Sequence, residues 1–315
     1  TDGPCNRGHK DNSIVKGARV FNKMKFLFNF ILLFFVISMP FKVFAQEEIL
    51  IGLIPEQNIF KQMERYRPLA SYLSEKAGVK IKLTILSRYG DIVERFVSRS
   101  LDGAFFDSLT GAMAITRLGV EPMARPVNLD GKSTVRSYIF VRADSKINSV
   151  TDMKGKKVVF VDRATATGYL FAVAFLHENG IQDINRYFNE YFFTGSHDSA
   201  IYSVLDNRAD IGSAQDTIFN MLVSKDPTIK RELRIIAQSE ELPETTLCLR
   251  KSISSKIKTS ITDILLHMNE DPAGKEILKK FGAVKFIRAE AGDFNSVFNL
   301  ARRAQINIKE YKGTR

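Results

Sequence analysis

Cysteine is nearly absent from this chain. Among its 315 residues, only Cys5 and Cys248 carry a thiol. Cys5 lies in an N-terminal segment that we expect to be removed, so the working protein holds one thiol and cannot form an internal disulfide. Cys248 lies in the apolar, strand-like run 245–249, which is typical of a buried structural thiol and not of a nucleophile. The protein must therefore rely on its core, which a chain of about 270 residues can supply.

The motifs of common enzymes are also missing. The sequence holds no Gly-x-Ser-x-Gly nucleophile elbow, no Gly-x-x-x-x-Gly-Lys-Ser/Thr phosphate loop and no His-Glu-x-x-His zinc motif. His197 and Asp198 are adjacent, but neighbouring residues on a helix face different directions, so they are not part of a catalytic triad. Cysteine and histidine residues do not have the spacing of metal ligands. We therefore expect a protein that is not an enzyme and needs no metal or cofactor.

Positive charge is in excess, but only slightly. The full chain holds 46 Lys/Arg and 35 Asp/Glu, a net charge of +11. Residues 1–45 account for 7 Lys/Arg and 2 Asp/Glu, so the remainder carries 39 against 33, or +6. The basic residues are scattered and form no stripe interleaved with aromatic residues, so we expect no binding to nucleic acid. A weak positive field would still attract an anionic ligand.

The first 45 residues read as a targeting segment. Met24 begins a short basic region, and residues 26–39 are almost wholly apolar. This run is shorter than the ~20 residues of a membrane span. Val43-Phe44-Ala45 places small residues where a signal peptidase inspects the chain. We therefore expect an upstream extension over 1–23, a signal peptide over 24–45 that is cleaved near Ala45, and an exported protein. An uncleaved membrane anchor is the alternative.

Strand and helix patterns alternate along the rest of the chain with short connections. This alternation predicts an α/β fold with mainly parallel strands. Residues 46–142 with 250–315 would form one Rossmann-like lobe, and 143–249 would form a second. Two strand crossings, near 140–145 and 245–251, would join the lobes as a hinge beside a ligand cleft.

The expected elements follow from apolar periodicity and from glycine, proline and capping residues. The strands are Ile49–Ile54, Val79–Leu86, Gly103–Phe106, Ser137–Val141, Val158–Val161, Tyr191–Phe193, Asp210–Ser213, Arg234–Ala237 and Thr246–Leu249. The helices include Ile59–Ala77, Asp91–Ser100, Ser108–Leu118, His197–Asp206, Thr259–Glu270, Pro272–Phe281 and Asp293–Ala301. The segment 252–315 reads as helical, without a sheet of its own, and would return to buttress the first lobe.

The most informative stretch joins a strand to a helix. The β-branched run Val158–Val161 leads into Thr165-Ala166-Thr167-Gly168, and an apolar helix follows that ends at Gly180. Backbone N–H groups at a helix start point outward with no carbonyl to meet them, and the helix dipole makes this end positive. Together with two threonine hydroxyls, these groups suit a small oxyanion. An ordinary threonine N-cap is the alternative.

A second polar helix start has the same setting. Gly195-Ser196-His197-Asp198-Ser199 follows the strand Tyr191–Phe193. Ser196 would cap the helix, Asp198 favours its positive end, and His197 would offer a ring N–H to a ligand. Parallel strands bring their carboxyl ends to one edge of a sheet, where α/β proteins bind ligands. We therefore expect both helix starts at one site. A solvated or capping histidine is the alternative.

The first lobe offers two polar segments that would lie opposite. Pro55-Glu56-Gln57-Asn58 follows its first strand, with Glu56 as the expected ligand contact, and Phe105-Phe106-Asp107-Ser108 follows its third. Phe105 or Phe106 would form an apolar wall of the cleft. Because strand alternation points these two rings in opposite directions, a place in the core is the alternative for one of them.

These segments together resemble a known family. Residues 51–56, Asp102-Gly103-Ala104-Phe105-Phe106, Asp152-Met153-Lys154-Gly155, Thr165-Ala166-Thr167-Gly168-Tyr169 and Gly195-Ser196-His197-Asp198 are similar, in order and spacing, to periplasmic solute-binding proteins of the phosphonate/phosphite/phosphate branch, which serve ABC transporters. The resemblance covers roughly residues 48–290. It implies a type II-like periplasmic binding-protein fold whose two lobes close on the ligand, with an ABC permease as partner. We expect a monomer in the periplasm.

The resemblance also implies which residues hold the oxyanion. Those roles fall on Thr165, Thr167, the backbone of Gly168 and Tyr169, and His197. Ala166 stands where the family has a third hydroxyl residue, and losing a donor to a charged group costs about 1.5–3 kcal/mol.

Two further positions bear on the ligand. Phe106 stands where the first lobe of family members often has tyrosine. Family members that bind aminophosphonates use carboxylates for the amine, and the corresponding regions here contain Asp216 and Glu244. The sequence does not decide which of these two faces the cleft. Asp216 is kept as a candidate contact, but an aminoalkyl ligand is not expected.

Several functions compete at this point. The first is the solute-binding subunit of an ABC transporter, which captures a small phosphorus oxyanion and delivers it to the permease. Another small organic ligand, similar to taurine or a thiamine precursor, is the nearest alternative. A ligand-sensing module of a membrane receptor is a second, which an uncleaved anchor would favour. A small hydrolase of the cell envelope is disfavoured by the missing nucleophile motifs.

Overall fold

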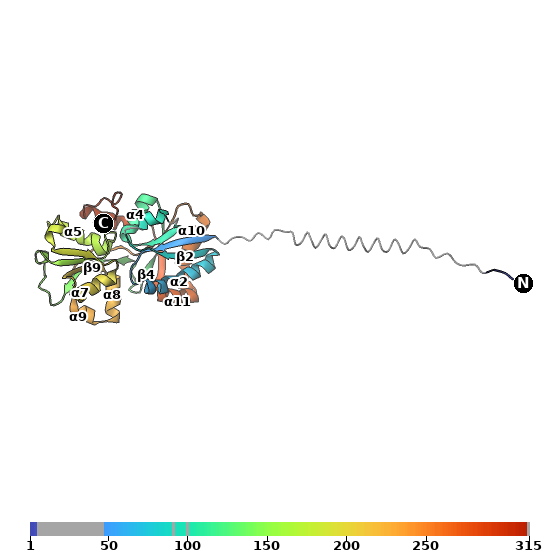
Figure 1. The fold of residues 1–315 in the computed structure, drawn as a ribbon, viewed down its shortest axis with the longest axis horizontal. Helices are drawn as coiled ribbons and strands as arrows, with labels where there is room; N and C mark the ends of the chain where they lie inside the picture. The colour runs from blue at the N-terminus through green and yellow to red at the C-terminus, as the bar shows by residue number, and fades with distance from the viewer. Residues whose placement is uncertain (5–46, 90–91, 99–100, 314–315) are drawn as a thin grey trace. The chain divides into compact units, whose positions relative to one another are not determined.

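The structure, a computed structural model, describes residues 1–4, 47–89, 92–98 and 101–313 (Figure 1). The chain divides into two units, 1–45 and 46–315. The predicted signal peptide, its cleavage site and most of the predicted upstream extension lie outside the described residues. Among the residues that are described, no helix is both long enough and apolar enough to cross a membrane. The following description concerns the second unit.

A six-stranded mixed sheet forms the first lobe. Its strands are β1 (Glu48–Leu53), β2 (Lys80–Ile85), β3 (Gly103–Phe106), β4 (Glu121–Asn128), β12 (Thr246–Leu249) and β13 (Ala283–Arg288). They lie in the order β13-β4-β12-β3-β1-β2. β1 pairs in parallel with β2 and β3, whereas β12 runs antiparallel to β3 and β4. The carboxyl ends of β1, β2 and β3 therefore share one edge.

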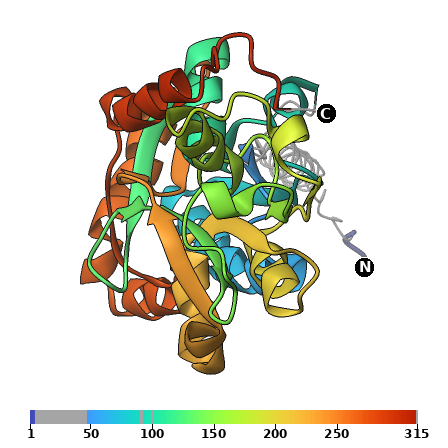
Figure 2. The ribbon, with the colours of Figure 1, turned by 90° about the vertical axis from the view of Figure 1, so that its left-hand side faces the viewer.

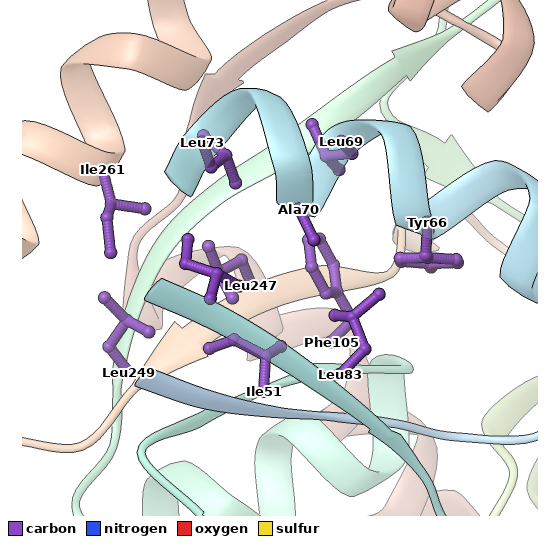
Figure 3. Close-up of a pocket in the computed structure, with 11 residues that line it drawn as sticks. Ile51, Tyr66, Leu69, Ala70, Leu73, Leu83, Phe105, Leu247, Leu249 and Ile261 are labelled. Atoms are coloured by element: carbon purple, nitrogen blue, oxygen red, sulfur yellow. The ribbon is translucent and has the colours of Figure 1, made fainter. Parts of the chain in front are cut away.

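Helices cover both faces of this sheet. They are α2 (Ile59–Ala77), α3 (Ile92–Ser98), α4 (Ser108–Leu118), α10 (Ser255–His267), α11 (Pro272–Phe281) and the short η3 (Met268–Glu270). Figure 3 shows Leu69 and Leu73 of α2 above Ile51 and Leu247 of the sheet, with Ile261 of α10 beside them. The gap among these side chains is apolar and about 10 Å³ in volume, which is the size of one water molecule. It belongs to the core, not to a ligand site.

Capping residues set the ends of the principal helices. The Asn58 side chain accepts hydrogen bonds from the N–H groups at the start of α2, and Gly78 ends the helix with φ 66°. Asp107 caps α4 in the same manner, and Gly119 ends it with φ 62°. Glycine adopts this left-handed conformation without the steric cost that a Cβ would bring. These caps explain why the predicted bounds of α2 and α4 are confirmed.

A five-stranded mixed sheet forms the second lobe. Its strands are β6 (Ser137–Arg142), β7 (Lys157–Phe160), β8 (Glu190–Phe193), β9 (Ile211–Gln215) and β10 (Leu233–Gln238). Their order is β10-β6-β9-β7-β8. β7 pairs in parallel with β8 and β9, and β6 runs antiparallel to β9 and β10. The carboxyl ends of β7, β8 and β9 therefore also share an edge.

The second lobe has its own helices on both faces of its sheet (Figures 1 and 2). They are the π-helical turn η2 (Ala166–Leu170), α5 (Phe171–Glu178), α6 (Ile184–Tyr187), α7 (His197–Leu205), α8 (Asp216–Lys225), α9 (Thr228–Glu232) and the short η1 (Thr151–Met153). α5 packs on the face that carries Val158 and Phe160. α7 and α8 pack on the opposite face, where the rings of Phe140 and Phe219 are 5.6 Å apart.

Three segments connect the lobes. Two of them pair with each other as β5 (Thr134–Val135) and β11 (Leu242–Pro243), a short antiparallel ladder. The third contains η4 (Ala291–Phe294) and α12 (Asn295–Arg303). α12, dark red in Figure 2, contacts α4 of the first lobe and α5 of the second. The connection is therefore a paired hinge with a helical tie beside it.

The prediction of an α/β fold with two lobes is confirmed, but two details of it are wrong. The strands are not mainly parallel, because most of the pairings in the two sheets are antiparallel. The segment after residue 252 is not wholly helical, because β13 forms an edge of the first sheet beside β4. The sequence predicts neither β4 nor β13. Cys248 is buried, as expected of a structural thiol.

Two strands belong to a different sheet than the sequence predicts. β6 was assigned to the first lobe but pairs with β9 and β10 in the second sheet. β12 was assigned to the second lobe but lies between β3 and β4 in the first sheet. Both exchanges have one cause: the chain crosses between the lobes at β5 and β11, earlier than at the expected crossings near 140–145 and 245–251.

Candidate ligand-binding site

Four segments that follow parallel strands meet between the lobes. From the first lobe come Tyr89, after β2, and Asp107, after β3; from the second come η2, after β7, and His197, after β8. Asp107 Oδ2 accepts a long hydrogen bond from the Ala166 N–H across the lobes (3.4 Å), and the rings of Tyr89 and His197 are 6.2 Å apart. All of these residues are buried. We call Tyr89, Asp107, Ala166–Tyr169 and His197 the interlobe seam.

The start of η2 presents backbone N–H groups that have no partner within the helix. Because the turn is π-helical, its first hydrogen bond runs from the Leu170 N–H to the Thr165 carbonyl (3.1 Å). The N–H groups of residues 166–169 therefore precede the intrahelical bonds. Gly168 allows the close approach of the preceding strand, since a Cβ there would lie 2.5 Å from the Val161 Cβ. This approach holds the helix start against the end of β7.

The two threonine hydroxyls at this helix start differ. The Thr165 hydroxyl donates to the Asp162 carbonyl at 2.7 Å, so its proton is already used within the turn. The Thr167 hydroxyl has no hydrogen-bond partner within the described part of the chain. The Thr167 carbonyl is fixed by the hydroxyls of Ser137 (2.5 Å) and Ser213 (3.1 Å). Of the two hydroxyls, Thr167 is the one that is available to a ligand.

One residue connects the two polar helix starts of the second lobe. The Val161 N–H donates to the Gly168 carbonyl (3.2 Å), and the Val161 carbonyl accepts from the Gly195 N–H (2.8 Å). Gly195 immediately precedes the N-cap of α7. The sheet therefore brings the starts of η2 and α7 side by side, as expected for the ends of neighbouring parallel strands.

His197 contributes a neutral ring. Burial lowers its pKa from 6.5 to about 4, so the imidazole is uncharged at neutral pH. Its Nδ1 accepts a hydrogen bond from the Gln215 N–H at 3.1 Å, which leaves the ring proton on Nε2. His197 therefore offers one N–H donor to a ligand without adding a charge.

Tyr89 adds a hydroxyl from the first lobe. Its side chain is fully buried, and its hydroxyl has no hydrogen-bond partner within the described ranges. Burial raises the pKa of this phenol well above its ordinary value, so the hydroxyl keeps its proton. A buried donor without an acceptor is costly. A ligand that accepts from Tyr89 would remove that cost.

Asp107 brings a carboxylate to the same place. Its Oδ1 accepts from both the N–H (2.8 Å) and the hydroxyl of Thr110, which completes the N-cap of α4. Its Oδ2 faces the Ala166 N–H of the second lobe. Burial raises the pKa of Asp107 to about 6, although the hydrogen bonds from Thr110 and Ala166 lower it.

Beyond the seam, a cavity of about 820 Å³ lies between the lobes. It is lined by residues from the end of β1, the start of α2, the hinge and α8. Its acidic lining residues include Glu56, Asp216 and Glu244, and its basic ones are Lys61, Arg65, Lys225 and Lys280. Glu56 and Glu244 are buried, whereas Lys61 and Lys225 are exposed. The inner part of the cavity is therefore acidic, whereas its rim carries exposed lysines together with the exposed carboxylates Glu64 and Asp130.

Hydrogen bonds hold the inner carboxylates in place. Glu56 accepts from the Thr245 hydroxyl at 2.8 Å, and burial raises its pKa although Arg65 opposes this. Glu244 accepts from the Asn128 amide at 2.6 Å and from the Thr245 N–H at 2.8 Å. Burial raises the pKa of Asp216 to about 6. No group of three or more acidic, histidine or cysteine side chains in the described ranges is arranged to hold a metal ion.

Comparison with known proteins identifies the family. Residues 51–294 match the family model of the periplasmic substrate-binding protein of phosphonate ABC transporters. The chain belongs to this family. It is therefore a substrate-binding component of an ABC transporter for phosphonate, phosphite or phosphate, and not an enzyme.

Individual relatives agree with this assignment. The probable phosphite-binding protein PhnD1 of Prochlorococcus marinus is 24% identical over 296 residues, which is 90% of this chain and 98% of that one. The phosphate-import protein PhnD of Mycolicibacterium smegmatis is 26% identical over 67% of this chain and 68% of that one. The phosphonates-binding periplasmic protein of Escherichia coli is 24% identical over 75% and 70%.

Solved structures share the fold. A binding-protein component of a phosphonate transporter from Pseudomonas aeruginosa superposes with a TM-score of 0.75 at 21% identity, over 82% of this chain and 87% of that one. PhnD1 of Prochlorococcus marinus in complex with methylphosphonate gives 0.72 at 20% identity, over 82% and 98%. These likenesses confirm the type II periplasmic binding-protein fold.

In this binding protein, the expected contacts fall into three groups. Thr165, Ala166, Thr167, Gly168, Tyr169 and His197 lie at the ends of β7 and β8, while Glu56 and Asp216 line the cavity. The side chain of Tyr169 points elsewhere, because its hydroxyl accepts from Arg163 at 2.9 Å; only its backbone faces the helix start.

Ser196 and Phe106 make up the third group, because the side chain of each is engaged elsewhere. The Ser196 hydroxyl donates to Asp198 (2.5 Å) and makes no capping bond, so its expected role as the cap of α7 is wrong. Phe106 is fully buried, with its ring 5.9 Å from that of Phe96. Of the two roles weighed for Phe106, the structure shows the one in the core.

Tyr89, Asp107 and Glu244 are not among the ligand contacts that the sequence predicts. Tyr89 follows β2. Ligands of α/β proteins bind at the carboxyl ends of parallel strands, and this rule applies to β2 as it does to β1 and β3. Asp107 was noted in its segment but not singled out, because its contact to Ala166 joins residues 59 positions apart. The sequence does not decide whether Glu244 or Asp216 faces the cleft, and in the structure both line the cavity.

Proposed function

We propose that this protein captures one small phosphorus oxyanion in the interlobe seam and hands it to the membrane permease after the lobes have closed around it. One observation carries the proposal: the outward N–H groups of η2 lie beside a neutral, buried His197. The ring of Tyr89 lies 6.2 Å from that of His197, and its buried hydroxyl has no hydrogen-bond partner among the described residues. Such donors suit an anion, because they stabilise its charge without requiring a buried cation. Thr167 supplies the hydroxyl contact.

Thermal unfolding in the presence of single ligands tests this proposal. The purified protein would be melted with phosphate, phosphite, methylphosphonate, aminoethylphosphonate or sulfate. A ligand at a hundred times its dissociation constant stabilises the folded form by about 2.7 kcal/mol, which is a readily visible shift. We expect a shift with at least one phosphorus oxyanion. The absence of a shift with all of them would contradict the proposal.

Variants assign the site. Thr167→Val removes the available hydroxyl and keeps the side-chain shape, so it should weaken the ligand-induced shift. Thr151→Val is the matched control, because Thr151 is exposed in η1, away from the seam. Equal shifts in both variants would show that the oxyanion binds elsewhere.

A ligand with an amino group is the second candidate. The sequence argued against it because neither Asp216 nor Glu244 could be assigned to the cleft. Both line the cavity together with Glu56. Burial raises the pKa of Glu56 and of Asp216, and a cationic group beside them would favour their charged forms. Tighter binding of aminoethylphosphonate than of methylphosphonate would support this candidate. Weaker binding would leave the oxyanion alone as the recognised group.

The cellular form of the protein is also a proposal. We infer that the chain is exported to the periplasm, cleaved near Ala45, and acts there as a monomer. N-terminal sequencing and the native mass of the exported protein test this directly. A mature protein that begins near Gln46 is expected, and retention of residues 24–45 would favour the anchored alternative.

A further inference from the structure

Asp107 places a carboxylate oxygen at the helix start where the oxyanion is proposed to bind. Its Oδ1 is fully engaged by Thr110 in capping α4. Among the described residues, its Oδ2 contacts only the Ala166 N–H, at 3.4 Å. Because a carboxylate oxygen accepts two hydrogen bonds, Oδ2 keeps a free acceptor position that faces the seam.

This carboxylate is deeply enclosed, and no salt bridge within the described part of the chain gives it a counter-ion. Asp107 is 8% exposed. The groups that affect it most are the Thr110 and Ala166 donors and the carboxyl of Glu56; none of these is a cation. An uncompensated buried carboxylate repels a second anion strongly, because the low dielectric of the interior does not screen the two charges. A fully ionised oxyanion and an ionised Asp107 therefore do not fit side by side.

A proton between the two anions removes this conflict. Phosphate, phosphite and phosphonates carry a P–O–H group in a large fraction of molecules near neutral pH, whereas sulfate carries no proton. A P–O–H group would donate to Asp107 Oδ2, while the other oxygens of the ligand accept from η2, His197 and Tyr89. Sulfate would satisfy the donors but would leave Oδ2 facing an acceptor.

We propose that Asp107 is a specificity-determining residue that admits oxyanions able to donate a hydrogen bond and rejects those that cannot. The inference rests on the proposed function, because it presumes that the seam is the oxyanion site. The binding step is balanced as follows. A protonated monoanion brings its own proton, and a dianion takes one proton from the solvent as it binds, while Asp107 remains ionised.

Titration calorimetry of the full-length protein tests the proposal. Phosphite, methylphosphonate and sulfate would be titrated at pH 7.5 into the unmodified protein and into Asp107→Asn. Asparagine keeps the N-cap of α4 and presents an amide donor where Oδ2 was. We expect the preference for the phosphorus oxyanion over sulfate to fall by about tenfold or more in the variant, as for loss of one charged hydrogen bond.

Two further variants exclude a structural explanation. Asp107→Ser keeps a capping hydroxyl but has no group that reaches Ala166, and it should lose the preference as well. Asp183→Asn is the matched control, because Asp183 caps α6 in the same way on an exposed surface. Its preference should equal that of the unmodified protein. Thermal melting verifies that each variant is folded.

Acidification gives an independent test. Protonated Asp107 can donate to sulfate, so the affinity for sulfate should rise as the pH falls from 7.5 to 5. Of the other ionisable groups that face Asp107, Tyr89 and His197 stay neutral over this range, and Glu56 is retained in Asp107→Asn. The rise should therefore vanish in Asp107→Asn. A rise that persists there would assign the effect to Glu56 and would overturn the proposal.

The outcomes separate the two proposals. If the unmodified protein binds no phosphorus oxyanion, the proposed function fails and this inference fails with it. If it binds phosphite and sulfate equally, or if Asp107→Asn leaves the preference unchanged, the function stands and the inference is overturned. If Asp107→Asn raises the affinity for all ligands by the same factor, Asp107 only competes with the ligand for the helix start and does not discriminate between ligands. The inference is then also overturned.

Discussion

The second lobe supplies backbone and imidazole N–H donors to the interlobe seam, whereas the first lobe supplies the Asp107 carboxylate beside the Tyr89 hydroxyl. Backbone N–H groups of η2 and the neutral ring of His197 come from the second lobe, and Asp107 comes from the first, with Glu56 in the adjoining cavity. This division implies two tasks. In the proposed function, the second lobe would hold the negative charge of the ligand, and the first lobe would test which atoms of the ligand carry protons or positive charge.

The largest loss of stability and affinity is expected from disrupting the donors of the second lobe, which are the N–H groups of η2 and the ring of His197. Gly168→Ala places a Cβ 2.5 Å from the Val161 Cβ and 2.7 Å from the Thr165 hydroxyl. Because strand and helix start must separate, we expect the free energy of unfolding to fall by about 3 kcal/mol and ligand affinity to be lost. Urea unfolding and calorimetry measure the two effects. Gly292→Ala is the control, because a Cβ there would have no atom within 4 Å, and a similar loss in both variants would contradict this account.

The donor half should also lose stability in acid. The pKa of His197 is about 4 in the folded protein and 6.5 when unperturbed. Its contribution is therefore complete above pH 6.5 and is lost as the pH falls towards 4, by about 2–3 kcal/mol. The difference in unfolding free energy between the unmodified protein and His197→Gln should follow this window. A flat difference curve for His197→Gln would refute the burial of a neutral ring.

The acidic half should show the opposite dependence. The pKa of Asp107 is about 6 in the folded protein against 3.8 when unperturbed. Its contribution is complete below pH 3.8 and is lost as the pH rises through 6, when a buried charge must form. Asp107→Asn should therefore stabilise the ligand-free protein at pH 7.5 by about 1–3 kcal/mol relative to pH 4. Chemical unfolding at the two pH values measures this, and destabilisation at pH 7.5 would contradict it.

The smallest effect concerns the helical tie between the lobes. Arg303 of α12 contacts Glu178 of α5 at 2.5 Å and Glu240, near the hinge, at 2.7 Å. Because these groups are partly exposed, Arg303→Met should lower the free energy of unfolding by only about 0.5–1 kcal/mol. Ligand preference should not change. Arg302→Met, on the exposed side of the same helix, serves as the control, and an altered ligand preference in Arg303→Met would mean that the tie takes part in recognition.

Much of the fold follows from local patterns. The bounds of α2, α4 and α11 agree with the expectation, because capping side chains and left-handed glycines mark their ends in the sequence itself. β4 was missed because it contains Pro122 and Pro126, which usually argue against a strand between two neighbours. It pairs with β12 and β13 through register shifts instead. Sheet membership depends on such long-range pairing, which no local pattern encodes.

The site divides in the same way. The start of η2 and His197 were predictable, because each is a polar helix start directly after a strand. Asp107 and Tyr89 act through contacts to the other lobe, and these depend on how the hinge brings two sheets together. The unpartnered hydroxyl of Tyr89 is a property of packing, so only the structure reveals it.

The most direct test of this account follows the backbone amides by NMR. Methylphosphonate would be titrated into ¹⁵N-labelled protein while the signals of Ala166, Thr167, Gly168 and Tyr169 are recorded. If the oxyanion binds at the start of η2, these signals should show the largest shifts, together with the Nε2–H of His197. Shifts confined to the rim of the cavity, at Lys61 and Lys225, would contradict the account.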